Sequence, residues 1–205
     1  MTTTLSTSVR TVRADEQATA VSTIVAAFAS DPMARWSWPS AHDYLRLMPA
    51  LTLAFGGSAF AQGSAFCTDG HEGVALWLPP GVSPDEEAMA ALLQESLDEG
   101  RQQEMSSIFE QMERHHPQEP HWYLPLIGVD PACQGKGYGS ALLRYVTDRF
   151  DREGAVAYLE SSNPRNIPLY ERHGFEQVAR IQAGSSPTMV AMVRRPRAAA
   201  GGRRG

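Results

Sequence analysis

The chain has 205 residues, which is long enough for one domain with a substantial core and short for two. Its net charge of −5 gives no reason to expect nucleic acid or an anionic membrane as a partner, and its two cysteines are too few for a disulfide framework. With no apolar leader and no long apolar stretch, we expect a cytoplasmic protein. We expect one domain over residues 1–195 and a disordered tail rich in Arg, Ala and Gly at 196–205.

Apolar residues in the first part of the chain recur with the spacing of strands and helices in turn. Alternation over 9–15 predicts a strand, and an apolar stripe predicts a helix after it that ends at Asp31-Pro32. The next elements expected are a helix over 43–55 interrupted by Pro49, then two strands at 58–68 and 72–78.

The middle of the chain predicts two helices with many exposed acids and no obvious chemistry. Ser83 is a good N-cap, Pro84 suits the first helical position, and Glu86 would complete a capping box. Gly100 is expected to end this helix, and a further helix follows that ends before Pro117.

The second half of the chain predicts most of the sheet. Residues 121–129 form an apolar run typical of a buried strand, although Pro125 predicts a bulge or a gap in its pairing. The helix after it should end near Gly154. The remaining elements are a strand at 155–160, a short helix stopped by Gly174, and the two final strands "FEQVARI" and "TMVAMVRR". This order indicates a single α/β or α+β domain with a central sheet.

The segment "GVDPACQGKGYGSALL" concentrates glycine between a strand and a helix. The first turn of a helix offers backbone N–H groups without internal partners and a partial positive charge, and glycine lets an anion approach them closely. The loop therefore predicts a diphosphate site. Its donors and nearby charge would come from Gly135, Lys136, Gly137, Tyr138, Gly139 and Ser140.

Two common phosphate loops do not fit this segment. A P-loop requires GxxxxGK[ST], but the Gly-Lys pair at 135–136 is followed by another glycine. A dinucleotide fingerprint requires GxGxxG after a first strand, but its sixth position is Ser140 and the loop lies past the middle of the chain. The pattern [Q/R]xxGx[G/A] does fit, at Gln134, Gly137 and Gly139.

Two segments together resemble the GNAT superfamily of N-acetyltransferases. "VDPACQGKGYGSALL" is similar to its acetyl-CoA-binding motif, and "NPRNIPLYERHGFEQV", about 30 residues further on, is similar to its next motif. The resemblance covers residues 121–180. It implies a central mixed, mostly antiparallel sheet flanked by helices, with strands that splay at the acetyl-CoA site. It also implies direct transfer of an acetyl group from acetyl-CoA to a primary amine.

The resemblance also implies the remaining contacts of the acetyl-CoA site. The backbones of Ile127 and Val129 would pair with the pantetheine arm like an added strand. Asn163 and Asn166 are candidates to hydrogen-bond the cofactor, and Asn166 aligns better. The alternative is that both asparagines only make turns beside the neighbouring prolines.

Transfer to an amine needs an acid for the departing thiolate and a base for the amine. Tyr170 matches the family's usual tyrosine acid, and the alternative is a tyrosine that only packs its helix. For the base, Glu160 ends a strand near the expected splay, His121 has a suitable intrinsic pKa, and His115 and His116 lie in a polar turn. A relay through water needs none of them. The histidines have no cysteine or carboxylate at ligand spacing, so we expect no metal.

Trp36, Trp38 and Trp77 are candidates to line the acceptor pocket, with core packing as an equal alternative. We expect the acceptor to be a small-molecule amine and the protein to be a monomer or homodimer. One alternative is acetylation of a protein or peptide, which would need an open groove where the two middle helices are expected. Another is a non-catalytic CoA-binding sensor, against which Tyr170 and the complete glycine loop argue.

Overall fold

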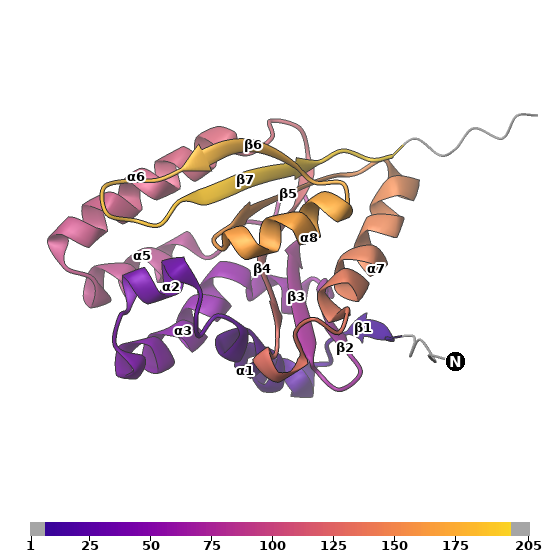
Figure 1. Ribbon diagram of the computed structural model, residues 1–205, viewed down its shortest axis with the longest axis horizontal. Coiled ribbons are helices and arrows are strands. Elements are labelled where there is room, and N and C mark those ends of the chain that lie inside the picture. Colours follow the sequence, from indigo (N-terminus) through magenta and orange to yellow (C-terminus); the bar gives the residue numbers. More distant parts are fainter. Residues whose placement is uncertain (1–6, 198–205) are drawn as a thin grey trace, which may run out of the picture.

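A seven-stranded sheet runs through the centre of the structure, a computed structural model that describes residues 7–197 (Figure 1). The strands are β1 (Val9–Thr11), β2 (Ala65–Thr68), β3 (Gly73–Leu78), β4 (His121–Val129), β5 (Val156–Ser161), β6 (Glu176–Ile181) and β7 (Met189–Arg194). Their order in the sheet is β1-β2-β3-β4-β5-β7-β6. Every neighbouring pair is antiparallel except β4 and β5, which are parallel. The mixed, mostly antiparallel sheet is therefore confirmed.

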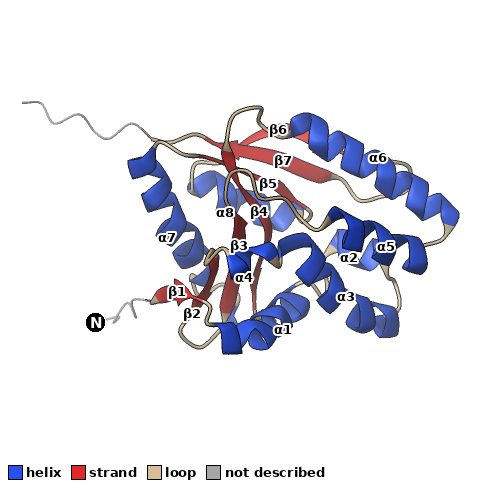
Figure 2. Ribbon diagram, turned by 180° about the vertical axis from the view of Figure 1, so that it is seen from behind, coloured by secondary structure: helices blue, strands red, loops and turns tan. Residues whose placement is uncertain are grey.

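Helices cover both faces of this sheet (Figures 1 and 2). They are α1 (Gln17–Ala27), α2 (Pro32–Ser37), α3 (Ala41–Gly56), α4 (Ser58–Ala61), α5 (Glu86–Ser96), α6 (Glu99–His115), α7 (Tyr138–Glu153) and α8 (Ile167–Arg172). Successive side chains of a strand point to opposite faces, so Val74, Leu76 and Leu78 join one core while Ala75 and Trp77 join the other. Helices α1, α3, α5 and α6 pack on the first core, and α7 and α8 on the second.

Two predictions about the region before β3 are wrong. Helix α3 is not interrupted at Pro49 but continues through it. The carbonyl that the proline leaves without an N–H partner belongs to Leu45, which is 61% exposed, so water can satisfy it. Residues 58–61 are helical rather than extended, because a short apolar run does not by itself distinguish a helix from a strand.

The starts of the two middle helices also differ from the prediction. Asp85, not Ser83, caps α5, and its carboxylate accepts from the backbone N–H of Ala88 at 2.9 Å. Asp98 caps α6 in the same way, so Gly100 lies in the first turn of α6 and does not end α5. Aspartate caps a helix as well as serine does, so several capping residues in a row leave the starting point open.

The strand at 121–129 and its irregularity at Pro125 are confirmed. The register between β3 and β4 shifts between Leu76 and Leu78, opposite Pro125. On its other side, β4 pairs with β5 only at residues 121–123. The two parallel strands therefore separate beyond Tyr123, which is the expected splay.

Two further observations concern the ends of the chain and its helices. Within residues 7–197, no helix combines the length and the apolar character that crossing a membrane requires. Of the basic tail predicted at 196–205, residues 198–205 lie outside the described part of the chain.

Candidate active site

The splay between β4 and β5 leaves one edge of β4 open. The backbone N–H of Asp130 donates to the carbonyl of Glu72 on the β3 side, at 2.8 Å. Because backbone groups alternate along an antiparallel ladder, those of Val129 and Ile127 point away from β3 and into the opening. The carbonyl of Val129 accepts a hydrogen bond there from Gln134 Nε2 at 3.2 Å. The open edge has the orientation that an added strand requires.

The glycine loop leads from this edge into α7. Gly135 and Gly137 adopt φ angles of +76° and +93°, a backbone conformation that other residues adopt only with strain. A Cβ atom on either would meet no atom within 4 Å, so the loop surface is open. Gly137 is the N-cap of α7, and among the described residues no side chain caps this helix. The first N–H groups of a 16-residue helix are therefore free to bind an anion.

One groove collects nearly all residues predicted to contact the cofactor. Lys136 is the exception, because its Nζ turns back and donates to the carbonyl of Ala132 at 3.0 Å. Arg165 and Arg172 also line the groove, and sequence reasoning missed both although they stand inside the second motif. The predicted residues that line it are Ile127, Val129, Gln134, Gly135, Gly137, Tyr138, Gly139, Ser140, Asn163 and Asn166.

The polar side chains of this groove differ in whether they already make hydrogen bonds within the protein. Asn163 caps the short 3₁₀ helix Pro164–Asn166 through a bond from the N–H of Arg165 at 3.1 Å, as its turn-making alternative requires. Asn166 makes no such capping bond at the start of α8. The hydroxyl of Ser140 lies 3.1 Å from His173 Nε2. Asn166 is therefore the better placed of the two asparagines to bind a ligand.

Tyr170 forms part of the groove wall at the second core. Its side chain comes from α8 and the residue is 5% exposed. Burial, together with the nearby negative charge of Asp31, raises the pKa of Tyr170. The phenol therefore keeps its proton at neutral pH and is a possible donor.

Asp31 lies where the groove meets a second, inner cavity, and it lines both. One carboxylate oxygen accepts from the N–H groups of Met33 and Ala34, at 3.0 and 3.1 Å, and thereby caps α2. The other accepts from Ser162 Oγ at 2.6 Å. Burial raises the pKa of Asp31. The sequence predicted that Asp31-Pro32 ends a helix. In the structure Asp31 begins helix α2, because Asp is a good N-cap and Pro suits the first helical position.

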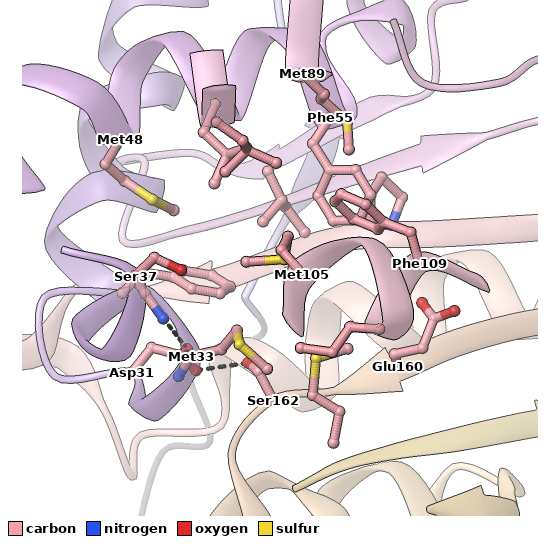
Figure 3. Close-up of a pocket in the computed structure, with 18 of the residues that line it drawn as sticks. Asp31, Met33, Ser37, Met48, Phe55, Met89, Met105, Phe109, Glu160 and Ser162 are labelled. Atoms are coloured by element: carbon pink, nitrogen blue, oxygen red, sulfur yellow. Dashed lines mark hydrogen bonds between the residues drawn. The ribbon is translucent and has the colours of Figure 1, made fainter. Parts of the chain in front are cut away.

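The inner cavity lies between α2, α3, α5, α6 and the splayed strands (Figure 3). Its wall is apolar except for Asp31, Ser37, Glu160 and Ser162. Six of the chain's eight methionines line it, namely Met33, Met48, Met89, Met105, Met112 and Met189. An adaptable apolar wall with a few polar groups is typical of a small-molecule site.

The three tryptophans expected at the acceptor pocket occupy different places. Trp38 lines the inner cavity, and its Nε1 donates to Ser96 Oγ at 3.1 Å. Trp36 donates to Ser185 Oγ at 3.1 Å and is not part of the cavity wall. Trp77 is fully buried against Phe150 on the opposite face of the sheet. The prediction for Trp77 is therefore wrong, because its position in β3 turns it toward α7.

Glu160 connects the inner cavity to two histidines. Its carboxylate is 3% exposed, accepts from the hydroxyl of Tyr123 at 2.8 Å, and lies 3.4 Å from His116 Nε2. His116 Nδ1 lies 3.2 Å from His121 Nε2. Burial lowers the pKa of His121. His116 thus connects Glu160 to His121, so three of the predicted base candidates lie in one chain of contacts. The fourth, His115, is exposed at the end of α6.

Another cluster of polar groups lies at the opposite edge of the sheet. Glu16, Cys67 and His71 each place one possible ligand atom within 4.8 Å of the others. The Glu16 carboxylate is already bound by Arg10 and Arg13, at 2.7 and 2.6 Å. Two guanidinium groups at this distance oppose a metal cation, so we assign no metal here.

Known proteins are similar to this chain in both motifs and, more weakly, over most of its length. Residues 105–175 match the model of the acetyltransferase (GNAT) family. An uncharacterised N-acetyltransferase of Schizosaccharomyces pombe is 27% identical over 183 residues, covering 80% of this chain and 72% of the relative. The N-alpha-acetyltransferase RimI of Mycobacterium tuberculosis is 50% identical over 54 residues, covering 25% of this chain and 33% of the relative.

Solved structures share the complete fold. A Corynebacterium glutamicum structure described as histone acetyltransferase HPA2 and related acetyltransferase has a TM-score of 0.66 and 24% identity, covering 96% of this chain and 100% of its own. The polyamine N-acetyltransferase of Drosophila melanogaster has a TM-score of 0.62 and 16% identity, covering 92% and 99%. Residues 105–175 therefore belong to a domain of the acetyltransferase (GNAT) family, and the solved structures show that the same fold extends over most of the chain.

Proposed function

We propose that this acetyltransferase moves the acetyl group of acetyl-CoA to the primary amine of a small molecule by direct transfer. The observation that carries the proposal is the junction between the groove and the inner cavity. Asp31 lines both, and a small third hollow, which shares part of its wall with each of them, is lined by Tyr170 and Glu160. A donor in the groove and an acceptor in the cavity would therefore meet beside an acid and a base.

The groove would hold acetyl-CoA mainly through its backbone. The uncapped N–H groups from Gly135 to Ser140 would bind the diphosphate, and the open edge at Ile127 and Val129 would pair with the pantetheine arm. Arg165 and Arg172 add positive charge along the same groove. Lys136, turned away, has no direct part in this arrangement.

The chemistry would need one proton donated and one removed. Tyr170 donates to the departing thiolate, since its raised pKa keeps the phenol protonated. Glu160 accepts the proton of the amine, directly or through water. His116 and His121 then pass it outward, and the lowered pKa of His121 leaves that imidazole neutral and able to accept at pH 7.

A small acceptor fits the cavity better than a peptide does. Helices α5 and α6 contribute Met89, Leu93, Met105 and Ile108 to its wall and so cover the acceptor side. A peptide acceptor would need an extended open groove there. The similarity to RimI, an N-alpha-acetyltransferase, covers only 54 residues.

Two likenesses support an amine acceptor without identifying it. The Drosophila structural neighbour is a polyamine N-acetyltransferase. The combination of "AAF…DP", "VALWLPP", "EPHWYL…GVDP…QGKGYGS" and "LESSNPRNIPLYERHGF" is partly similar to puromycin N-acetyltransferase, which acetylates an aminonucleoside. This narrower resemblance stays a prediction, and no substrate is carried over from it.

The test is release of free thiol from acetyl-CoA in the presence of a panel of primary amines. We expect release with some amines, a decrease of about 100-fold in kcat for Tyr170→Phe, and little change in acetyl-CoA affinity. Tyr145→Phe is the matched control, because Tyr145 is 47% exposed on α7. Binding of acetyl-CoA without thiol release with any amine would instead favour a sensor.

A further inference from the structure

The polar groups of the inner cavity are gathered on one side. Figure 3 shows Asp31, Ser162 and Glu160 along one side of the cavity, and Met48, Phe55 and Met89 along the opposite side. The first group comes from the start of α2 and the end of β5. The second comes from α3 and α5. An acceptor would therefore have its amine beside the acids and the rest of its body against an apolar wall.

We propose that the acceptor is a monoamine whose amine is carried on an apolar alkyl or arylalkyl body, and that the cavity rejects diamines and polyamines. The inference rests on the proposed function and narrows its substrate class. It separates this chain from its structural neighbour that is a polyamine N-acetyltransferase, although the two share a fold.

The reason for rejecting a second ammonium is the lack of a partner for it. Both carboxylates of the cavity wall lie on the side of the reacting amine. Asp31 already accepts three hydrogen bonds, and Glu160 faces Tyr123 and His116. A second charge on the opposite side would lose its hydration and gain no counter-charge, which is among the costliest exchanges in a protein.

The methionines indicate that the cavity accepts amines whose apolar parts differ in shape. Six methionines line the cavity, and their unbranched, polarisable side chains adapt to ligands of different outline. Leu93, Ile108 and Phe55 complete the same wall. Linear alkyl and aryl bodies of similar size should therefore both be accepted, whereas charge at the far end should not.

The test compares hexylamine with 1,5-diaminopentane, which has the same chain length and replaces a terminal methyl group by an ammonium. For the full-length protein with acetyl-CoA, we expect kcat/KM for hexylamine to exceed that for the diamine by at least about 100-fold. Binding of each amine in the presence of CoA, followed by calorimetry, should show the same preference without turnover.

A pair of variants at the far wall sharpens the test. Met89→Glu places a carboxylate opposite Asp31 and Glu160, and Met89→Gln has the same shape without the charge. We expect Met89→Glu to improve the diamine relative to hexylamine by at least about tenfold, and Met89→Gln not to. Met89 is 7% exposed, so a polar side chain there costs stability in both variants, and circular dichroism checks that each is folded before the amines are compared.

The possible results distinguish a failure of the proposed substrate class from a failure of the proposed function. Equal use of the two amines by the wild type, within about threefold, overturns the substrate class while acetyl transfer stands. Equal behaviour of the two Met89 variants overturns the placement of the apolar wall. Absence of thiol release with both of these amines, while another primary amine of the panel is acetylated, overturns the inference and leaves the proposed function standing. Absence of release with the whole panel, despite acetyl-CoA binding, overturns both.

Discussion

The groove proposed to bind acetyl-CoA and the inner cavity are made of different parts of the protein. The groove is mainly a backbone site, made of a splayed strand edge and the uncapped start of α7, and its wall comes from residues 27–31, 127–140 and 163–172. The cavity is a side-chain site, assembled from α2, α3, α5, α6 and the two splayed strands. Changes of backbone conformation should therefore affect binding in the groove, and changes of charge should affect binding in the cavity.

The largest expected effect concerns the base at the junction. Glu160→Gln keeps the shape of the side chain but cannot take up a proton, so we expect kcat to fall by about 100-fold with acetyl-CoA affinity unchanged. His116→Gln should cost less, about tenfold, because water can replace part of the relay. His115→Gln is the matched control, since His115 is the exposed neighbour. Stopped-flow measurement of thiol release checks all three.

The pH dependence of the same relay has a defined sign. Burial lowers the pKa of His121, so this imidazole is neutral and able to accept a proton above that pKa and charged below it. We expect the wild-type rate to fall as the pH falls through the region below about 6.5, the ordinary value for histidine. A rate profile that is the same in His121→Gln would contradict the relay.

The next effect concerns the glycine loop. Gly137→Ala places a Cβ on a residue with φ of +93°, and Gly81→Ala does the same at φ of +82° in a loop outside the groove. Both should lose about 1–2 kcal/mol of stability from backbone strain. Only Gly137→Ala should weaken acetyl-CoA binding, by about tenfold in calorimetry. Equal loss of affinity in both variants would show that the strain, not the loop, is responsible.

The smallest effect concerns Asp31, which belongs to both regions. Asp31→Ala removes the cap of α2 and should cost about 1–2 kcal/mol in the free energy of unfolding. Asp31→Asn keeps an oxygen for the N–H groups of Met33 and Ala34, so we expect a change below about 1 kcal/mol at pH 7. Urea unfolding of the two variants measures both quantities.

The sign of the pH dependence distinguishes the charge of Asp31 from its shape. Because burial raises the pKa of this carboxyl, the folded protein holds its proton more tightly than the unfolded chain does. That stabilisation is present below about pH 3.9, the ordinary value for aspartate, and is lost as the pH rises through the raised pKa. The free energy of unfolding of Asp31→Asn should therefore increase relative to that of the wild type as the pH rises. A constant difference would contradict the raised pKa.

The same contrast explains what could be predicted from the sequence. The strand at 121–129 and the glycine loop are local features, since an apolar run and a need for positive φ are both visible in neighbouring residues. The cavity is not local. The contact of His116 with Glu160 joins the end of α6 to β5, and the orientation of Trp77 depends on which face of the sheet α7 covers. Asp31 was missed because the same dipeptide can end one helix and begin another.

The proposed reaction requires that the acetyl donor in the groove and the amine in the cavity meet beside Tyr170. The most direct measurement is the affinity of a conjugate in which the sulfur of CoA carries hexylamine through a two-carbon acetyl link, compared with CoA alone. We predict that the conjugate binds at least about 100-fold more tightly, because it occupies both sites at once. Met89→Glu should weaken the conjugate and not CoA. Equal affinity of the conjugate and CoA for the wild type would contradict the claim that donor and acceptor meet beside Tyr170.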